Sequence, residues 1–348
     1  MRRTTLWQRS WGSKQADSPS FDTLTVEGHG QTHTTKTALD RHLFPMISTP
    51  RMARQKTTSD RPHERHRGAR GTSQLGSAGR SRYLTDLLFT LQSMADHSSI
   101  EWTEATWNPT TGCDRISVGC DNCYALTLAK RLKAMGNAKY QSDGDPRTSG
   151  PGFGVMTHAG ALNLPRTWRK PRVVFVNSMS DLFHARVPDA FIREVFAVML
   201  DTPQHTYQLL TKRPKRLSRM AVSLPWPKNV WMGVTVENSE NAWRLDELRQ
   251  VPAAVRFCSA EPLLDALPSL DLSGIDWLIA GGESGPGHRE VHGDWIRDLR
   301  DQCSDTDTAF FFKQWGGHRP KARGRDLDGR KWDEMPLPKN RMSSSQTA

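Results

Sequence analysis

The chain has 348 residues and a formal charge of +11. This charge is uneven: residues 1–93 hold 15 basic and 7 acidic residues, or +8, whereas the remaining 255 hold 33 and 30, or +3. The larger part is nearly neutral, so the charge of the whole chain does not argue for nucleic-acid binding. No run of 18 apolar residues occurs, and no transmembrane helix is predicted. The odd cysteine count and the lack of a recognisable secretory signal predict reduced thiols and a cytoplasmic protein.

Residues 1–93 are polar and basic, and they sustain no apolar period. Such a composition buries too little apolar surface to offset the entropy of folding. We expect a disordered or spurious extension here, with a basic nucleic-acid-binding arm as the functional alternative. The composition changes at Met94, which we take as the natural start. The predicted folded domain is 94–338, followed by a disordered tail at 339–348.

From Met94 onward, strand-like runs alternate with helical periodicity. The stretch 98–109, with apolar residues at Ile100 and Trp102, suits a first short strand. Residues 124–135 have the apolar spacing of an amphipathic helix. Residues 137–170 are polar and rich in glycine and proline, and we interpret them as an insertion. Six later runs begin as strands and end in polar residues or glycines: 172–184, 205–214, 230–238, 255–263, 276–285 and 309–317.

This alternation predicts an α/β protein with a parallel sheet. About seven parallel strands suit a partial (β/α) barrel of the TIM type, since the eight-unit version typically takes about 250 residues. The alternative is an open doubly wound sheet. The barrel is favoured because nearly every strand ends in polar or glycine-rich residues, and in a barrel these ends converge on the face where sites are built.

Three of the five cysteines, Cys113, Cys120 and Cys123, form the pattern C-x6-C-x2-C. Closely spaced thiolates are usually held together by a metal, and three ligands leave one position of a four-coordinate site open. The pattern fits an iron–sulfur cluster, a zinc site completed by a distant histidine, or reduced thiols without metal. Cys258 and Cys303 are isolated and are expected to be packed thiols.

Several strand ends carry candidate ligand-binding residues. Gly281 and Gly282 would let backbone approach a ligand, and Glu283 could bind an amine or hydroxyl; a tight turn with a solvated glutamate is the plain alternative. Lys212 suits a carboxylate or phosphate, or is part of a solvated basic turn. Glu261 precedes Pro262, which restricts it to an extended conformation.

Two further groups lie at the strand end that contains Asn177. Asn177 is a polar residue at the point where sites are expected, and it is a candidate for cofactor binding. Asp181 and His184 could act as an acid–base pair, although a lone histidine after Phe183 is more often structural.

Together, these segments resemble an uncharacterised phage and prophage family with a three-cysteine motif, catalogued as phage gene products thirty-seven and sixty-eight. The resemblance runs from Ser98 to about Pro336 and stops short of residues 1–93. The motifs that carry it are Ile100-Glu101-Trp102-Thr103 through Cys123-Tyr124-Ala125, the run from Val176 to His184, Leu210-Thr211-Lys212-Arg213-Pro214, the run from Gly233 to Asn238, the run from Phe257 to Leu264, Gly281-Gly282-Glu283-Ser284-Gly285 and Phe312-Lys313-Gln314-Trp315-Gly316.

That family is regarded as similar to radical S-adenosylmethionine (SAM) enzymes. The resemblance implies that Cys113, Cys120 and Cys123 bind three irons of a [4Fe–4S] cluster and that the fourth iron takes the amino and carboxyl groups of SAM. Reductive cleavage would then yield a 5′-deoxyadenosyl radical. The sequence departs from the usual pattern: the first gap is six residues rather than three, Asn122 stands where an aromatic is usual, and the Gly-Gly-Glu run containing Glu283 lies on a late strand.

The leading hypothesis is therefore an iron–sulfur, SAM-dependent radical enzyme acting on an unknown substrate. The alternative is a zinc- or cluster-stabilised nucleic-acid-binding phage protein without catalysis, in which Lys212 and Arg213 contact phosphates. A third hypothesis is a scaffold that needs a partner protein encoded nearby.

Overall fold

The structure is a computed structural model, and it describes residues 98, 100–319 and 321–336. The expectations for residues 1–93 and 339–348, including Met94 as a start, lie outside the described residues. At its centre is a seven-stranded sheet in which all neighbouring strands are parallel. Its strands are β1 (Ala105–Trp107), β4 (Val173–Val176), β5 (Thr206–Thr211), β6 (Val230–Thr235), β7 (Val255–Ala260), β8 (Trp277–Gly281) and β9 (Ala309–Gln314).

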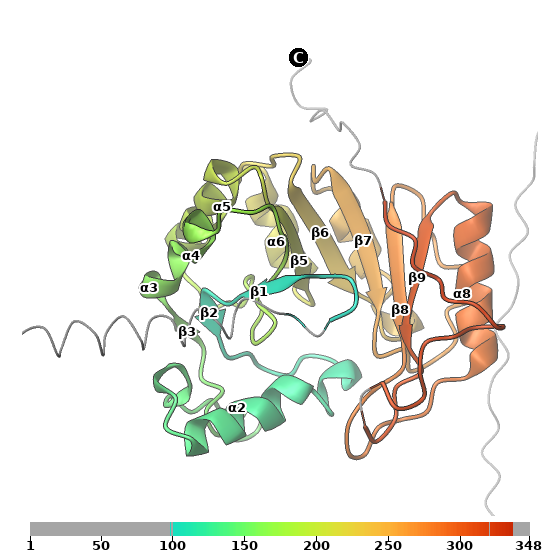
Figure 1. The fold of residues 1–348 in the computed structure, drawn as a ribbon, viewed down its shortest axis with the longest axis horizontal. Helices are drawn as coiled ribbons and strands as arrows, with labels where there is room; N and C mark the ends of the chain where they lie inside the picture. Colours follow the sequence, from blue (N-terminus) through green and yellow to red (C-terminus); the bar gives the residue numbers. More distant parts are fainter. Residues whose placement is uncertain (1–97, 99, 320, 337–348) are drawn as a thin grey trace, which may run out of the picture. The chain divides into compact units, whose positions relative to one another are not determined.

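The strand order is β1-β4-β5-β6-β7-β8-β9, so the sheet follows the chain without a reversal. A doubly wound sheet needs a point where the order reverses, and that alternative is therefore wrong. The sheet instead curls into a half-barrel, with helices on its outer side (Figure 1). The predicted α/β partial barrel of seven parallel strands is confirmed.

The helices alternate with the strands. They are α2 (Tyr124–Ala134), α3 (Ala159–Leu162), α4 (Leu164–Thr167), α5 (Asp189–Asp201), α6 (Pro214–Ala221), α7 (Arg244–Arg249) and α8 (Gly293–Asp305), with 3-10 turns η1 (Val118–Cys120), η2 (Ala138–Tyr140) and η3 (Ser239–Asn241). Helices α5 and α8 lie outside the curve of the sheet, whereas α2 lies beyond the carboxyl ends of the strands, at the bottom of this view (Figure 1). None of the helices in the described ranges is long and apolar enough to cross a membrane.

Aromatic side chains fill the concave face of the half-barrel. Trp277 lies at the centre, with ring centroids 6.0 Å from Trp102, 6.1 Å from Trp231, 5.6 Å from Phe257 and 5.9 Å from Phe311. Successive residues of a strand point to opposite faces. The concave face therefore continues along β6, β7 and β8 into polar residues at their carboxyl ends, where the aromatic layer stops.

The first strand lies within the stretch 98–109 in which it was predicted, at Ala105–Trp107. Ile100 and Trp102 precede this strand and lie in a turn. Trp102 packs edge-on against Phe175 in the concave core, at a ring-centroid distance of 4.9 Å. A residue that reaches the core from a turn is apolar in the same way as a core residue of a strand, so the sequence alone does not distinguish the two.

The segment 137–170, interpreted as an insertion, has structure of its own. Strand β3 (Met156–Thr157) pairs antiparallel with β2 (Thr110–Thr111), the strand that leads into the cysteine motif. Tyr140 and Phe153 are buried beside α2. The segment thus supports one side of the loop that carries Cys113, Cys120 and Cys123.

Candidate metal and cofactor site

The three-cysteine segment forms a loop between β2 and α2, at the carboxyl ends of the sheet strands. Cys113 follows β2, Cys120 ends η1 and Cys123 is the residue before α2. We call residues 112–123 the cysteine loop. Hydrogen bonds join this loop and the first residue of α2 to segments that follow β4, β5, β6 and β8. The expectation that the cysteines and the strand ends share one face is therefore met by the structure.

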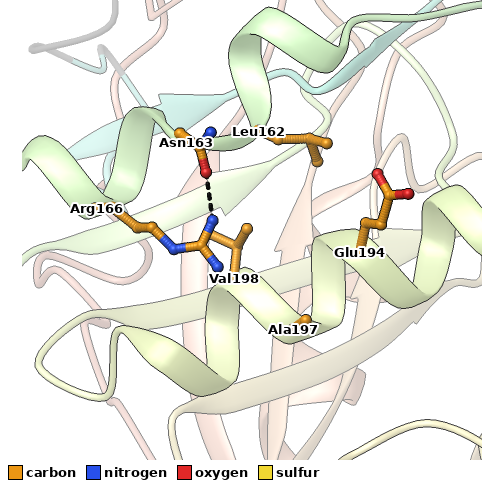
Figure 2. A pocket seen from close by; sticks show the side chains of 6 residues that line it. All are labelled: Leu162, Asn163, Arg166, Glu194, Ala197 and Val198. Atoms are coloured by element: carbon orange, nitrogen blue, oxygen red, sulfur yellow. Dashed lines mark hydrogen bonds between the residues drawn. The ribbon is translucent and has the colours of Figure 1, made fainter.

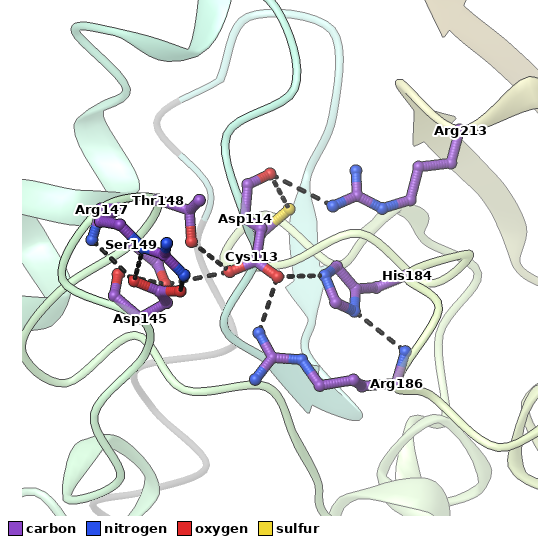
Figure 3. A network of polar contacts seen from close by, with 9 residues as sticks. All are labelled: Cys113, Asp114, Asp145, Arg147, Thr148, Ser149, His184, Arg186 and Arg213. Carbon is purple, nitrogen blue, oxygen red and sulfur yellow. Dashed lines mark hydrogen bonds and ion pairs between the residues drawn. The ribbon is translucent and has the colours of Figure 1, made fainter.

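Asp114 anchors the first part of the cysteine loop (Figure 3). Its Oδ1 accepts hydrogen bonds from Thr148 at 2.8 Å and Ser149 at 3.1 Å, and its Oδ2 contacts His184 Nε2 at 2.9 Å and Arg186 Nη2 at 2.7 Å. Burial disfavours the carboxylate, but these hydrogen bonds outweigh burial and lower the pKa of Asp114 to about 2. An ionised Asp114 thus joins the segment 145–149 to the segment after β4.

Glu237, at the end of β6, holds the middle of the loop. It is fully buried, and it contacts Ser117 Oγ at 2.7 Å, Lys212 Nζ at 3.2 Å and Arg244 Nη1 at 2.8 Å. Burial opposes its ionisation, but Lys212 and then Arg244 lower the pKa of Glu237 below its usual range. A Cβ on Gly119 would lie 2.4 Å from Glu237 Cγ, so η1 packs directly on this carboxylate. Lys212 is thus a partner of Glu237 rather than a solvated side chain.

Glu283, after β8, holds the end of the loop. Its Oε2 accepts hydrogen bonds at 2.9 Å from Asn122 Nδ2 and from the backbone N–H of Arg289, and its Oε1 lies 2.5 Å from Arg289 Nη2. Burial opposes ionisation, but the bonds from Arg289 and Asn122 lower the pKa of Glu283. Arg289 also donates to the carbonyl of Val118 in η1. The predicted residue Glu283 is therefore at the site, with its charge already paired.

The three thiols lie half-buried on the loop. Burial, and after it the charge of Asp181, raises the pKa of Cys113, whereas Arg213 lowers it; burial also raises the pKa of Cys123. Thiols with raised pKa values are protonated at neutral pH, so a metal would have to displace their protons. The described part of the chain contains no group of three or more His, Cys, Asp or Glu side chains that is already arranged to hold a metal ion.

The chemistry of the donors fits a thiolate-bound metal with an additional ligand. Three thiols on one short loop are the ligand type of iron–sulfur and zinc sites. Two buried donors nearby have no hydrogen-bond partner: Nδ2 of Asn177 after β4, and Nη1 of Arg213 after β5. Asn177 has a φ of 63°, a left-handed conformation that few non-glycine residues adopt. Unpartnered buried donors suit an anionic or carbonyl-bearing ligand.

The remaining strand-end candidates are Glu261 and the two glycines Gly281 and Gly282. Glu261 lies after β7, and its Oε1 is 2.5 Å from Lys313 Nζ on β9. Gly282 is required by packing, because a Cβ there would lie 2.2 Å from the carbonyl oxygen of Trp315. At Gly281, a Cβ would meet only ordinary contacts of 3.5 Å or more. The backbone of Gly282 thus packs against the segment after β9. Glu261 is the charged candidate at this end, and it is already paired with Lys313.

Asp181 and His184 do not form a side-chain pair. Asp181 accepts hydrogen bonds from Thr211 Oγ1 at 2.7 Å and from the backbone N–H groups of Phe183 and Lys212, whereas His184 contacts Asp114. Both are buried residues that join segments, as the plainer reading of His184 predicted. Cys258 and Cys303 are buried in the core, as expected for packed thiols.

Sequence reasoning missed Asp114, Glu237 and Arg289 as members of the site. Glu237 stands at a strand end in the same way as Glu261 and Glu283, and that position was the available signal. Nothing local marks Asp114 or Arg289. His184 lies 70 positions from its partner Asp114. Arg289 is only six positions from Glu283 but 171 positions from Val118, the residue of the cysteine loop that it contacts.

A small hollow lies away from these strand ends, between the segment 162–166 and α5 (Figure 2). It encloses about 190 Å³ and is lined by Leu162, Asn163, Arg166, Glu194, Ala197 and Val198. Arg166 is held by Asn163 and by an ion pair with Asp201. This hollow contains no thiol and no strand-end residue, so it is not part of the candidate site.

The fold and site define an α/β half-barrel protein with a three-cysteine loop over the carboxyl ends of its strands. The chain belongs to the family described as "Protein of unknown function (DUF5131)", whose model matches residues 97–336. No curated protein and no solved structure matches the chain.

Proposed function

We propose that this protein is an iron–sulfur enzyme of the radical SAM type, of phage or prophage origin, acting on a substrate that the site leaves open. The observation that carries the proposal is the position of the cysteine loop over the polar strand ends of a half-barrel. Asn177 and Arg213, which carry buried donors without partners, follow the carboxyl ends of β4 and β5. A partial TIM-like fold places sites at this end.

In this proposal, Cys113, Cys120 and Cys123 would hold three irons of a [4Fe–4S] cluster, and the chemistry that such a cluster would supply is the electron for reductive cleavage of SAM. The three sulfurs would have to draw together on binding, because no three such side chains are arranged for a metal in the described residues. Asp114, Glu237 and Glu283 hold the two ends and the middle of the loop in place. A reducing compartment such as the cytoplasm suits such a cluster.

The strand-end residues would orient SAM. Nδ2 of Asn177 would donate to its carboxylate. Glu261 would receive its ammonium in exchange for the present ion pair with Lys313. Glu283 and Lys212 act indirectly in this account, because Arg289 and Glu237 already pair them. Gly281 and Gly282 shape the end of β8 beside them.

The test is SAM cleavage by the anaerobically reconstituted full chain with a strong reductant. We expect 5′-deoxyadenosine and methionine from the wild type, and none from Cys120→Ala. Asn177→Ala should keep its iron and lose SAM binding. Iron-loaded wild type that neither binds nor cleaves SAM would refute the proposal.

The alternative is a zinc- or cluster-stabilised nucleic-acid-binding protein without catalysis. The observation in its favour is the basic segment that begins with Lys212 and Arg213 and continues into α6. Stoichiometric zinc without iron, together with salt-dependent nucleic-acid binding, would select this alternative.

A further inference from the structure

A basic pocket lies beside the cysteine loop, where the segment after β5 meets η3 and α7. It encloses about 360 Å³. Its lining includes six basic residues: Lys212, Arg213, Lys215, Arg216, Arg219 and Arg244. None of the residues that line it is acidic. Ile116, from between Cys113 and Cys120, forms part of its wall. The pocket is therefore continuous with the candidate site.

Half of these cations have structural partners. Arg244 and Lys212 share Glu237, at 2.8 Å and 3.2 Å. Arg216 donates to the carbonyls of His184 and Val187 and to Asp189. These contacts hold the wall of the pocket in place, and they account for two of the neighbouring carboxylates.

The other three cations have no carboxylate partner within the described ranges. Arg213 donates from Nη2 to the carbonyl of Asp114 at 3.2 Å, and its buried Nη1 has no partner. Lys215 and Arg219 are exposed on α6. Three uncompensated positive charges around one pocket cost free energy through mutual repulsion, and an anionic ligand would remove that cost.

An aromatic side chain completes the pocket. Trp243 is 39% exposed, and Lys215 Nζ lies 5.0 Å from the centre of its ring. Basic side chains along a groove, together with an exposed aromatic ring, are the combination that binds single-stranded nucleic acids, because phosphates pair with the cations and bases stack on the ring.

We propose that this pocket binds phosphate-ester groups, and that its ligand is a nucleic-acid strand whose backbone lies along Arg213, Lys215 and Arg219 beside the cysteine loop. A strand is favoured over a single nucleotide because the unpaired cations extend from the end of β5 along α6. The inference rests on the proposed function only in treating this ligand as the substrate, since the binding itself needs no metal.

The test measures binding of a fluorescent single-stranded oligonucleotide to the full chain by anisotropy, across a salt series. The variant is Lys215→Glu/Arg219→Glu. The matched control is Arg193→Glu/Lys228→Glu, which makes the same charge change at two exposed residues that do not line the pocket. All proteins keep residues 1–93, so any binding by that basic segment is common to them.

We expect the pocket variant to weaken binding by about tenfold or more and the control to leave it within about twofold. Three phosphate contacts on a single strand predict a logarithmic salt slope of about −2, which the pocket variant should reduce. A peptide nucleic acid of the same bases, which lacks phosphates, should not compete. Equal weakening by both variants, or competition by the peptide nucleic acid, would overturn the proposal.

A mononucleotide competitor distinguishes the two sources of phosphate. Competition only by oligonucleotides supports a strand, whereas competition by mononucleotide and oligonucleotide alike would overturn the strand and leave a nucleotide-phosphate site. Iron content, measured on the same samples, reports on the proposed function separately. A protein without iron would refute the proposed function, and it would leave the result of the oligonucleotide-binding experiment unaffected.

Discussion

At the scale of single residues, the site is built on buried charges that are paired before any ligand arrives. Glu237 shows this most clearly, because it is fully buried between Lys212 and Arg244 and also accepts a hydrogen bond from the hydroxyl of Ser117. Removing one member of a buried ion pair leaves an uncompensated charge. The site therefore depends on residues that need not touch any cofactor.

Glu237→Ala should accordingly destabilise the protein by about 3–5 kcal/mol. Denaturant unfolding measures this change. Glu290→Ala is the control, because the side chain of Glu290 is 76% exposed and lies 3.6 Å from Arg323. An exposed pair contributes about 0–1 kcal/mol. Equal losses in the two variants would contradict the role given to Glu237.

His158 predicts a pH dependence of stability. Its Nε2 lies 2.8 Å from Thr111 Oγ1, and burial, followed by the charge of Lys139, lowers its pKa from 6.5 to about 4. The unfolded chain therefore takes up a proton at His158 before the folded chain does, so stability is full above pH 6.5 and falls as the pH drops toward 4. As the pH drops through this range, the unfolding free energy of His158→Gln should fall less steeply than that of the wild type. Identical pH profiles for the two proteins would contradict the role given to His158.

At the scale of elements, the cysteine loop is held by the segments that follow four strands, β4, β5, β6 and β8. Only part of this could be predicted. The helix after the motif and the buried face of α5 follow from apolar periodicity, and both are confirmed. The apolar positions expected to form the buried face of α2 do not do so: Tyr124, Leu128 and Met135 are exposed, and its buried residues are Ala125 and Ala129. The hydrogen bonds of Asn122 to Glu283 and of Ser117 to Glu237 join residues more than a hundred positions apart, and no local pattern encodes them.

Gly119→Ala tests how closely η1 packs on the end of β6. The added Cβ would lie 2.4 Å from Cγ and 2.5 Å from Oε1 of Glu237, whose carboxylate is fixed by its partners. We expect a loss of about 1–3 kcal/mol and reduced iron uptake. Gly160→Ala is the control: no atom lies within 4 Å of its Cβ, and it is in helix α3, where alanine is favoured. Unchanged iron and stability in Gly119→Ala would show that η1 is not tightly held.

At the scale of the whole molecule, parallel strands explain why the sequence was informative. The carboxyl ends of neighbouring parallel strands meet at one edge, so polar residues that end successive strands must lie together. Asn177, Lys212, Glu261 and Glu283 were predicted in this way, and the structure places each at such an end. The sequence could not show that Lys212 and Glu283 are already ion-paired, because their partners depend on how the loop crosses the half-barrel.

The proposed function depends on an iron–sulfur cluster bound by Cys113, Cys120 and Cys123. Its most direct measurement is iron and acid-labile sulfide per chain, with a visible spectrum, on the anaerobically reconstituted full-length protein. Cys120→Ala removes a loop thiol, and Cys303→Ala removes a buried core thiol as the matched control. We expect about four irons per chain in the wild type and in Cys303→Ala, and their loss in Cys120→Ala. Stoichiometric zinc without iron in the wild type, or equal iron in both variants, would contradict it.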